Sequence, residues 1–179
     1  MPVTGHIASL NSFFNLVPND STIVVTDDIE LQGKLILPAN KNLVIKGLEG
    51  KYPVISANGS IYLDAKSNYT FYGLTFDGFY SQSYDASIMY ANNYEGSLLI
   101  SECLFGDSGY ETLQFTPVDG ASIVIDGCDF IATEAVKRYI HIQSHYKGVG
   151  HAELTALQIT NNDFYCDNVT GDIICLNGF

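Results

Sequence analysis

Residues 98–105 read LLISECLF and residues 123–130 read IVIDGCDF, and both stretches follow one pattern of apolar and polar positions. Three other stretches repeat this phrase: LVIKGLEG at 43–50, YTFYGLTF at 69–76 and LQITNNDF at 157–164. The five copies begin about 25 to 34 residues apart, a period that is typical of solenoid proteins. Hairpins do not repeat one phrase in the same order, so the sequence favours stacked coils over an antiparallel sandwich.

The aligned phrases place similar residues in four columns. The columns are Leu43, Tyr69, Leu98, Ile123 and Leu157; Ile45, Phe71, Ile100, Ile125 and Ile159; Leu48, Leu74, Cys103, Cys128 and Asn162; and Gly50, Phe76, Phe105, Phe130 and Phe164. Parallel strands of successive coils lie about 4.8 Å apart, which stacks each column inside the molecule. We therefore expect Leu98→Asp or Ile125→Asp to unfold the chain.

A second short strand follows each phrase. The five strands are Ile61-Tyr62-Leu63, Ile88-Met89-Tyr90, Leu113-Gln114-Phe115, Ile140-His141-Ile142 and Ile173-Ile174-Cys175. Because side chains alternate along a strand, the middle residues are expected to face solvent as a strip of Tyr62, Met89, Gln114, His141 and Ile174. Parallel crossovers are right-handed, so we predict an all-β fold, a single-stranded right-handed parallel β-helix of about five coils.

The first 20 residues are expected to cap this helix. Apolar residues between Ile7 and Val17 follow the spacing of a short amphipathic helix. Residues 21–37 then alternate as a strand that belongs to the first coil or leads into it. The sequence thus divides into an N-terminal cap segment, 1–20, and a parallel β-helix domain, 21–179.

These features resemble the pectate-lyase-like family of parallel β-helix repeat proteins. The resemblance rests on the five phrases and on the stretch NDSTIVV…IELQGKLILPANKNLVIKG, and it covers most of residues 10–179. It implies architecture more than activity, because the family includes polysaccharide lyases and hydrolases, epimerases, phage tailspikes and non-catalytic virion proteins.

Composition excludes several classes of partner. The formal net charge of −12 repels nucleic acid and anionic membranes. No apolar stretch is long enough to span a membrane, and no signal peptide is visible at the N-terminus. The four cysteines lack the spacing of a zinc site, so we expect no metal and no cofactor. Cys103 and Cys128 are expected as neighbouring thiols in the core, where a disulfide stays open but is not expected from their geometry.

The predicted strip is poor in catalytic groups. Asp64 and Gln143 flank it, which leaves one carboxylate where acid–base cleavage of a polysaccharide needs two groups. Asp126 and Asp129 follow strands and are typical of turn residues. Asp64→Ala is accordingly expected to leave stability nearly unchanged, and the chain is predicted not to be an enzyme.

Tyrosines and basic residues are the candidate contacts with a partner or a glycan. The insertion after the second phrase carries Tyr80, Tyr84, Tyr90 and Tyr94, whose rings suit a sugar or a subunit interface. Basic groups gather at Lys137, Arg138, His141, His145 and Lys147, where no carboxylate is expected beside them. With Tyr62 from the strip, the candidate binding residues are Tyr62, Tyr80, Tyr84, Tyr90, Tyr94, Arg138 and His141.

Two functions remain open from the sequence. The first is a non-catalytic structural or binding module. The resemblance suggests that such a module is a component of a phage virion surface, as capsid decoration, head fibre or tail spike. Such a module would be made in the cytoplasm, displayed on the virion or an extracellular surface, and assembled as a homo-oligomer with other virion proteins or a surface glycan as partners. The last coil, which ends on apolar residues, favours an oligomer, and the resemblance implies a trimer. The alternative is a polysaccharide-active or glycan-binding protein of the same family.

Overall fold

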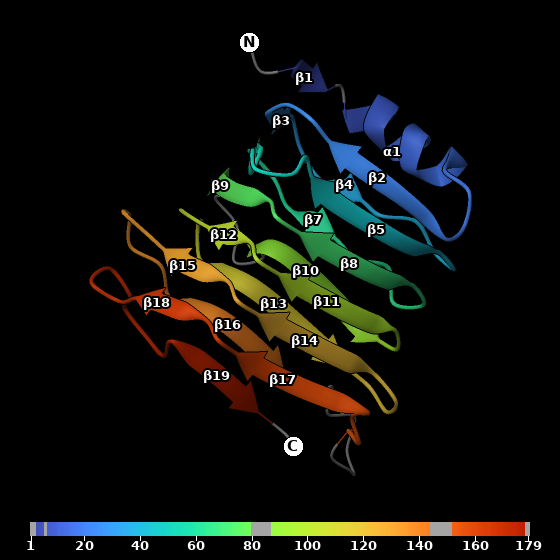
Figure 1. The fold of residues 1–179 in the computed structure, drawn as a ribbon. Helices are drawn as coiled ribbons and strands as arrows, with labels where there is room; N and C mark the ends of the chain where they lie inside the picture. Colours follow the sequence, from blue (N-terminus) through green and yellow to red (C-terminus); the bar gives the residue numbers. More distant parts are fainter. Residues whose placement is uncertain (1–2, 6, 80–86, 144–151, 178–179) are drawn as a thin grey trace.

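The structure is a computed structural model that describes residues 3–5, 7–79, 87–143 and 152–177. Its strands form three parallel sheets, A, B and C, and each coil contributes one strand to sheet B, then to sheet A, then to sheet C. In Figure 1 the strands of sheet B face the viewer and succeed one another from the blue cap to the red C-terminal end. The predicted parallel β-helix is confirmed.

The strands of each sheet follow the order of the coils. Sheet B consists of β2 (Ser21–Val25), β5 (Asn42–Gly47), β8 (Asn68–Tyr72), β11 (Ser97–Ser101), β14 (Ser122–Asp126) and β17 (Ala156–Thr160). Sheet A consists of β1 (Val3–Gly5), β3 (Ile29–Leu31), β6 (Val54–Ala57), β9 (Thr75–Phe79), β12 (Leu104–Phe105), β15 (Asp129–Ile131) and β18 (Asp163–Tyr165). Sheet C consists of β4 (Leu35–Ile36), β7 (Ile61–Tyr62), β10 (Ser87–Tyr94), β13 (Glu111–Pro117), β16 (Arg138–Gln143) and β19 (Ile174–Asn177).

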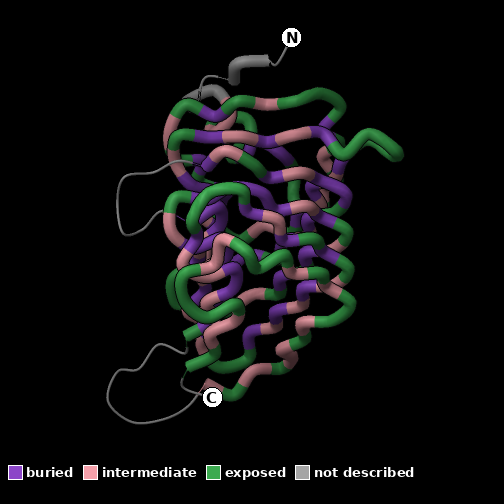
Figure 2. The backbone as a smooth tube through the Cα atoms, turned by 90° about the vertical axis from the view of Figure 1, so that its left-hand side faces the viewer, coloured by how far each residue is buried: buried purple, intermediate pink, exposed green. Residues whose placement is uncertain are grey.

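The two apolar columns of the phrases stack in register on sheet B. Leu98 pairs with Tyr69 and with Ile123, and the same register continues to Leu43 and Leu157. These residues are buried in the middle coils, where many positions of the tube in Figure 2 have the purple colour of buried residues. In the last coil, at the bottom of Figure 2, the inward residues are only partly buried.

The phenylalanine column forms a continuous aromatic stack inside sheet A. Ring centroids lie 5.2 Å apart for Phe76 and Phe105, 5.0 Å for Phe105 and Phe130, and 4.9 Å for Phe130 and Phe164. The interplanar angles of 13° to 15° make each pair nearly parallel. Stacked coils therefore bring equivalent rings into direct contact.

The first phrase departs from this stack more than its sequence indicates. Ile55, and not Gly50, pairs with Phe76, and Leu48 is exposed instead of lying in the column of Leu74. The chain between β5 and β6 is longer than the equivalent corner of later coils, and its extra residues turn outward into solvent. The predicted membership of Leu48 and Gly50 in the columns is wrong for this reason.

The N-terminal helix α1 (Ile7–Leu16) covers the first coil, as predicted (Figure 1). Phe14 and Val17 are buried against the coil, and Oδ1 of Asn11 accepts a 2.9 Å hydrogen bond from the backbone N–H of Ile36. Strands β2, β3 and β4 pair with their counterparts β5, β6 and β7. The segment after the helix is therefore a coil in its own right.

Cys103 and Cys128 are free, buried thiols of neighbouring coils. Burial and a hydrogen bond with Cys128 raise the pKa of the Cys103 thiol well above its ordinary value. Cys128 Sγ lies near the carbonyl of Ile100, at 3.7 Å. The pair belongs to the packed interior of the coils.

Candidate functional site

A row of half-buried side chains runs along the outer face of sheet C. Tyr90 pairs with Tyr62 on one side and with Gln114 on the other, and Gln114 pairs with His141. We call Tyr62, Tyr90, Gln114 and His141 the strip. Its members come from four successive coils, so they lie about 4.8 Å apart along the helix axis.

Two predicted members of this row are misplaced by one residue. Met89 is fully buried and Tyr90 takes its place, while Cys175 and not Ile174 lies beside His141. Strand β10 buries consecutive residues where it begins, at Ile88 and Met89, and β13 does the same at Thr112 and Leu113. Strict alternation fails at such a corner, and only the register with neighbouring coils shows which residue faces solvent.

The aromatic end of the strip holds a cation. The rings of Tyr62 and Tyr90 have centroids 5.0 Å apart at an angle of 58°. Nζ of Lys34 lies 4.5 Å from the centroid of Tyr62 and 4.8 Å from that of Tyr90. Cation–π contacts at exposed sites contribute about 0.5 to 1 kcal/mol, so Lys34 helps to order a surface of two adjoining rings.

The polar end of the strip is built around Glu111. Its Oε1 accepts a 2.7 Å hydrogen bond from Arg138, and its Oε2 lies 2.9 Å from Nδ1 of His141. The Glu111 side chain is only 3% exposed, and a carboxylate buried to that degree must be paired to be tolerated. Asp172 lies 3.7 Å from Nε of Arg138.

The expectation that no carboxylate accompanies the basic residues is therefore wrong. Glu111 is the residue that sequence reasoning missed, although a signal existed. It is the one acidic residue in the described strands of sheet C, and the repeat places it opposite Arg138 in the next coil. Together the three side chains make a neutralised cluster in which both carboxylate oxygens are already engaged.

Other predicted contacts fall elsewhere. Tyr94 is a fully buried core residue, and its hydroxyl lies within hydrogen-bonding distance of the carbonyl oxygens of Ser67, at 2.8 Å, and Ser97, at 3.0 Å. Its prediction as a surface contact is wrong. Tyr80, Tyr84, His145 and Lys147 lie outside the described residues.

The aspartates near the strip and in the repeated phrases accept hydrogen bonds that stabilise turns. Asp64 Oδ1 accepts a 3.0 Å hydrogen bond from the backbone N–H of Lys66. Asp126 accepts hydrogen bonds from Thr160 and Asn161 of the next coil, at 2.7 and 2.8 Å, and these bonds lower the pKa of the Asp126 carboxyl. These contacts stabilise corners, as expected for Asp beside strand ends.

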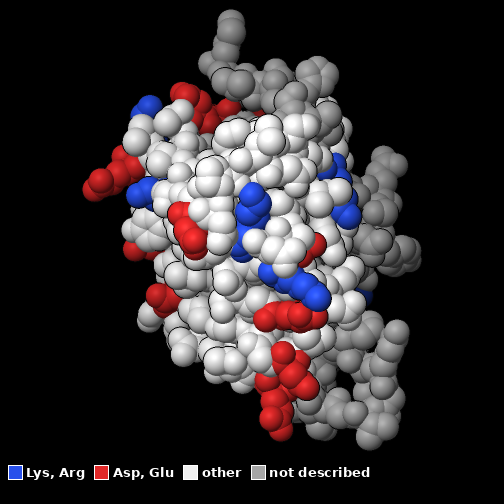
Figure 3. Space-filling view, turned by 90° about the vertical axis from the view of Figure 1, so that its right-hand side faces the viewer, with Lys and Arg blue, Asp and Glu red and all other residues white. Residues whose placement is uncertain are grey.

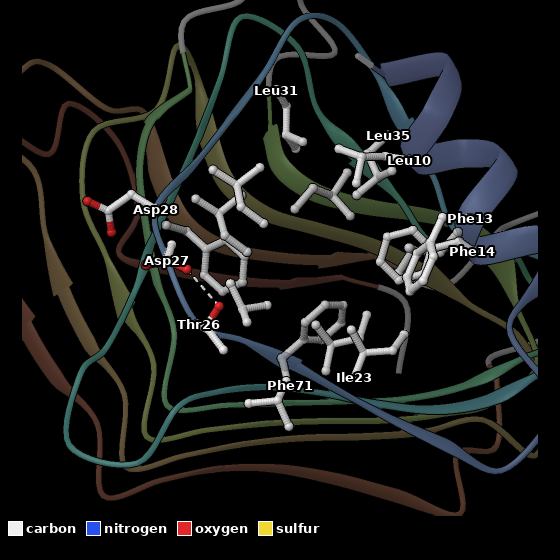
Figure 4. A pocket seen from close by; sticks show the side chains of 18 residues that line it. Leu10, Phe13, Phe14, Ile23, Thr26, Asp27, Asp28, Leu31, Leu35 and Phe71 are labelled. Carbon is white, nitrogen blue, oxygen red and sulfur yellow. Dashed lines mark hydrogen bonds between the residues drawn. The ribbon is translucent and has the colours of Figure 1, made fainter. Parts of the chain in front are cut away.

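An apolar cavity lies beneath α1, inside the first coil (Figure 4). It has a volume of about 270 Å³ between Leu10, Phe13 and Phe14 of the helix and side chains of the first three coils, and it opens to solvent. Its lining is almost entirely apolar, which makes it the second candidate site in the described part of the chain.

The surface charge is unevenly distributed. On the face in Figure 3, basic and acidic side chains intermix in the upper half, and towards the last coils at the bottom the charged side chains are acidic. Across the described ranges, no group of three or more His, Cys, Asp or Glu side chains could hold a metal ion. In the same ranges no helix is long and apolar enough to cross a membrane.

Comparisons with known proteins give no further assignment. No family model, curated protein or solved structure matches the chain. Any function must therefore be argued from the strip, the Glu111 cluster and the cavity themselves.

Proposed function

We propose that this chain is a non-catalytic structural and binding module that makes its contacts through the strip on sheet C. The supporting observation is the state of Glu111, whose two carboxylate oxygens are held by Arg138 and His141. General acid–base catalysis needs one group free to donate a proton and another free to accept it. A single buried and fully bonded carboxylate suits neither task.

The strip has the composition of a contact surface. Tyr62 and Tyr90 offer large ring faces that cost little conformational entropy to order, while Gln114 and His141 can donate and accept hydrogen bonds. Aromatic residues beside adaptable polar groups are enriched at protein interfaces. The surface therefore fits a protein partner or a second copy of the chain.

The resemblance to pectate-lyase-like β-helix proteins carries the proposal further. In that family, small non-catalytic members serve as surface components of phage virions, which here would mean capsid decoration, a head fibre or a tail spike. Such a component would assemble as an oligomer, by analogy a trimer. Its display on a virion or extracellular surface agrees with the acidic charge, which opposes binding to nucleic acid.

Glycan binding is the second candidate, and the Tyr62–Tyr90 pair is the observation that favours it. Amphipathic rings stack on the apolar faces of sugars, and the strip continues the same row with an amide and an imidazole. A polysaccharide-active version would in addition need Glu111 to be released from Arg138. Direct binding of neutral and acidic oligosaccharides, compared between wild type and Tyr62→Ala, separates this candidate from a protein interface.

Light scattering across a concentration series tests the proposal. Wild type should self-associate, and Tyr90→Ala should weaken association at least tenfold. The matched control is Tyr165→Ala, which removes an exposed tyrosine from sheet A and should leave association unchanged. A wild type that stays monomeric up to its solubility limit, or equal loss in both variants, would contradict assembly through the strip.

A further inference from the structure

The cavity beneath α1 lies where the first two coils are filled by aliphatic side chains that are smaller than the aromatic ones of the third coil. In the third coil Tyr69, Phe71 and Phe76 occupy the interior. The inward residues of the first coil are all aliphatic, namely Ile23, Val25, Ile29, Leu31, Leu35 and Leu37. The interior of the first coil is therefore filled by less side-chain volume than the interior of the third coil.

The register shows the difference at a single column. Ile23 pairs with Ile45, which pairs with Phe71, so the column changes from an aliphatic to an aromatic residue over three coils. Figure 4 shows Ile23 and Phe71 on the same side of the cavity, with Phe13 and Phe14 of α1 across from the Thr26–Asp28 corner. Ile45, Ile55, Ile61, Phe71 and Phe76 form the inner end of the cavity.

The mouth of the cavity carries negative charge. Thr26, Asp27 and Asp28 are exposed and lie at one side, where the Thr26 hydroxyl donates to Oδ2 of Asp27 at 2.7 Å and Asp28 accepts from the backbone N–H of Val54 at 2.8 Å. Among the described lining residues none is basic. An anionic head group would therefore be repelled, whereas a neutral or cationic one would not.

We propose that this cavity binds a small apolar molecule whose polar end, if it has one, is uncharged or cationic. Its volume of about 270 Å³ exceeds the roughly 150 Å³ of a dry apolar protein cavity that takes up benzene. A bicyclic aromatic compound or a short alkyl chain would fill it. The site is separate from the strip, so the inference stands independently of the proposed function.

Titration calorimetry with four probes tests the proposal on the full chain. Benzene and indole report on neutral aromatic ligands, while hexylamine and hexanoate share one alkyl chain and differ in the charge of the head group. Saturable binding of indole or hexylamine is expected, with hexylamine at least fivefold tighter than hexanoate. Burial of apolar surface should also give a negative heat-capacity change.

Ile23→Phe introduces a phenylalanine at the first-coil position of the column that contains Phe71 in the third coil, and its ring should fill part of the cavity. It should weaken probe binding at least tenfold while it raises the midpoint of thermal unfolding. Leu99→Phe is the matched control, because it adds the same ring on the outer face of sheet B. Val25→Leu is a milder filling variant that should weaken binding severalfold even if Ile23→Phe folds poorly.

Three results would overturn the inference. They are absence of saturable binding of every probe, unchanged affinity in both Ile23→Phe and Val25→Leu, and hexanoate binding as tightly as hexylamine. Tighter binding of indole than of hexylamine would support ligand binding in the cavity and indicate an aromatic ligand. The reverse order would also support ligand binding there and indicate an aliphatic ligand.

Discussion

Glu111 and Arg138 occupy register-paired positions on neighbouring coils, and their side chains meet in a 2.7 Å ion pair at the edge of the core. His141, three residues further along β16, holds the second carboxylate oxygen. The repeat therefore positions a charged cluster by the same stacking that aligns the apolar columns. Because Arg138 and His141 bind both carboxylate oxygens of Glu111, neither oxygen is free to take up a proton from a bound molecule.

Replacing Arg138 should be costly, because it leaves Glu111 buried with one partner fewer. Breaking a buried ion pair from one side costs about 3 to 5 kcal/mol, so Arg138→Met is expected to lower the free energy of unfolding by about 3 kcal/mol in urea. The double variant Glu111→Leu/Arg138→Met should recover most of that loss. Lys51→Met, at an exposed turn, is the control and should change stability by less than about 0.5 kcal/mol. Equal effects of Arg138→Met and Lys51→Met would contradict the cluster.

The phenylalanine stack should dominate the stability of sheet A. Phe105 is fully buried between Phe76 and Phe130, so Phe105→Ala is expected to cost about 3 to 5 kcal/mol. Tyr165→Ala on the same sheet removes a ring that is 56% exposed and should cost little. Chemical denaturation of both variants measures the contrast, and similar losses would mean that the rings do not stack as described.

Neighbouring leucines on β11 provide a test of which face is buried. Leu98 points inward and is 1% exposed, whereas Leu99 points outward and is 38% exposed. Leu98→Asp should abolish cooperative unfolding at 25 °C, since it buries an unpaired charge. Leu99→Asp should fold with a near-wild-type circular dichroism spectrum. If Leu98→Asp folded and Leu99→Asp did not, the register of β11 would have to differ by one residue from the one described.

Stability should fall in alkaline solution. Burial raises the pKa of Tyr69 from its ordinary value near 10 to about 12, and its hydroxyl donates to the Pro38 carbonyl at 2.7 Å. Because the folded-state pKa is the higher one, the contribution is complete below pH 10 and is lost as the pH rises from 10 to 12. Burial raises the pKa of Tyr94 as well.

Urea unfolding at a series of pH values from 8 to 11 measures this slope. Tyr69→Phe removes one of the three buried phenols, the others being Tyr94 and Tyr139, and should make the alkaline decrease shallower. It lowers stability at neutral pH by about 1 kcal/mol through the lost hydrogen bond. Tyr165→Phe is the control, because Tyr165 is 56% exposed. An unchanged slope in Tyr69→Phe would show that this phenol does not titrate with folding.

Much of the fold could be predicted because repetition exposes the register. The columns that begin with Leu43 and Ile45 needed no knowledge beyond the alignment of five phrases, since equivalent residues of parallel coils must stack. The corner after β5 could not be predicted, because Leu48 and Gly50 match the phrase by type while the chain there makes a longer turn. Apolar character alone does not distinguish a core position from an exposed loop.

The candidate sites were harder to predict for three physical reasons. At the start of β10, Ile88 and Met89 are both buried, so alternation did not reveal that Tyr90 faces outward beside Tyr62. The position of Glu111 follows from pairing between coils, which local sequence patterns do not contain. The cavity depends on side-chain volumes summed over three coils and on how α1 lies across them, and neither quantity is visible in one phrase.

The most direct test of the central claim, that the strip makes contacts and does not catalyse cleavage, is product release from a panel of acidic and neutral polysaccharides. Reducing ends and unsaturated products are measured after long incubation with wild type and with Glu111→Gln. The account predicts no product above the protein-free blank for either protein. Cleavage by wild type that Glu111→Gln abolishes, while circular dichroism shows that the variant remains folded, would contradict it and make Glu111 a catalytic residue.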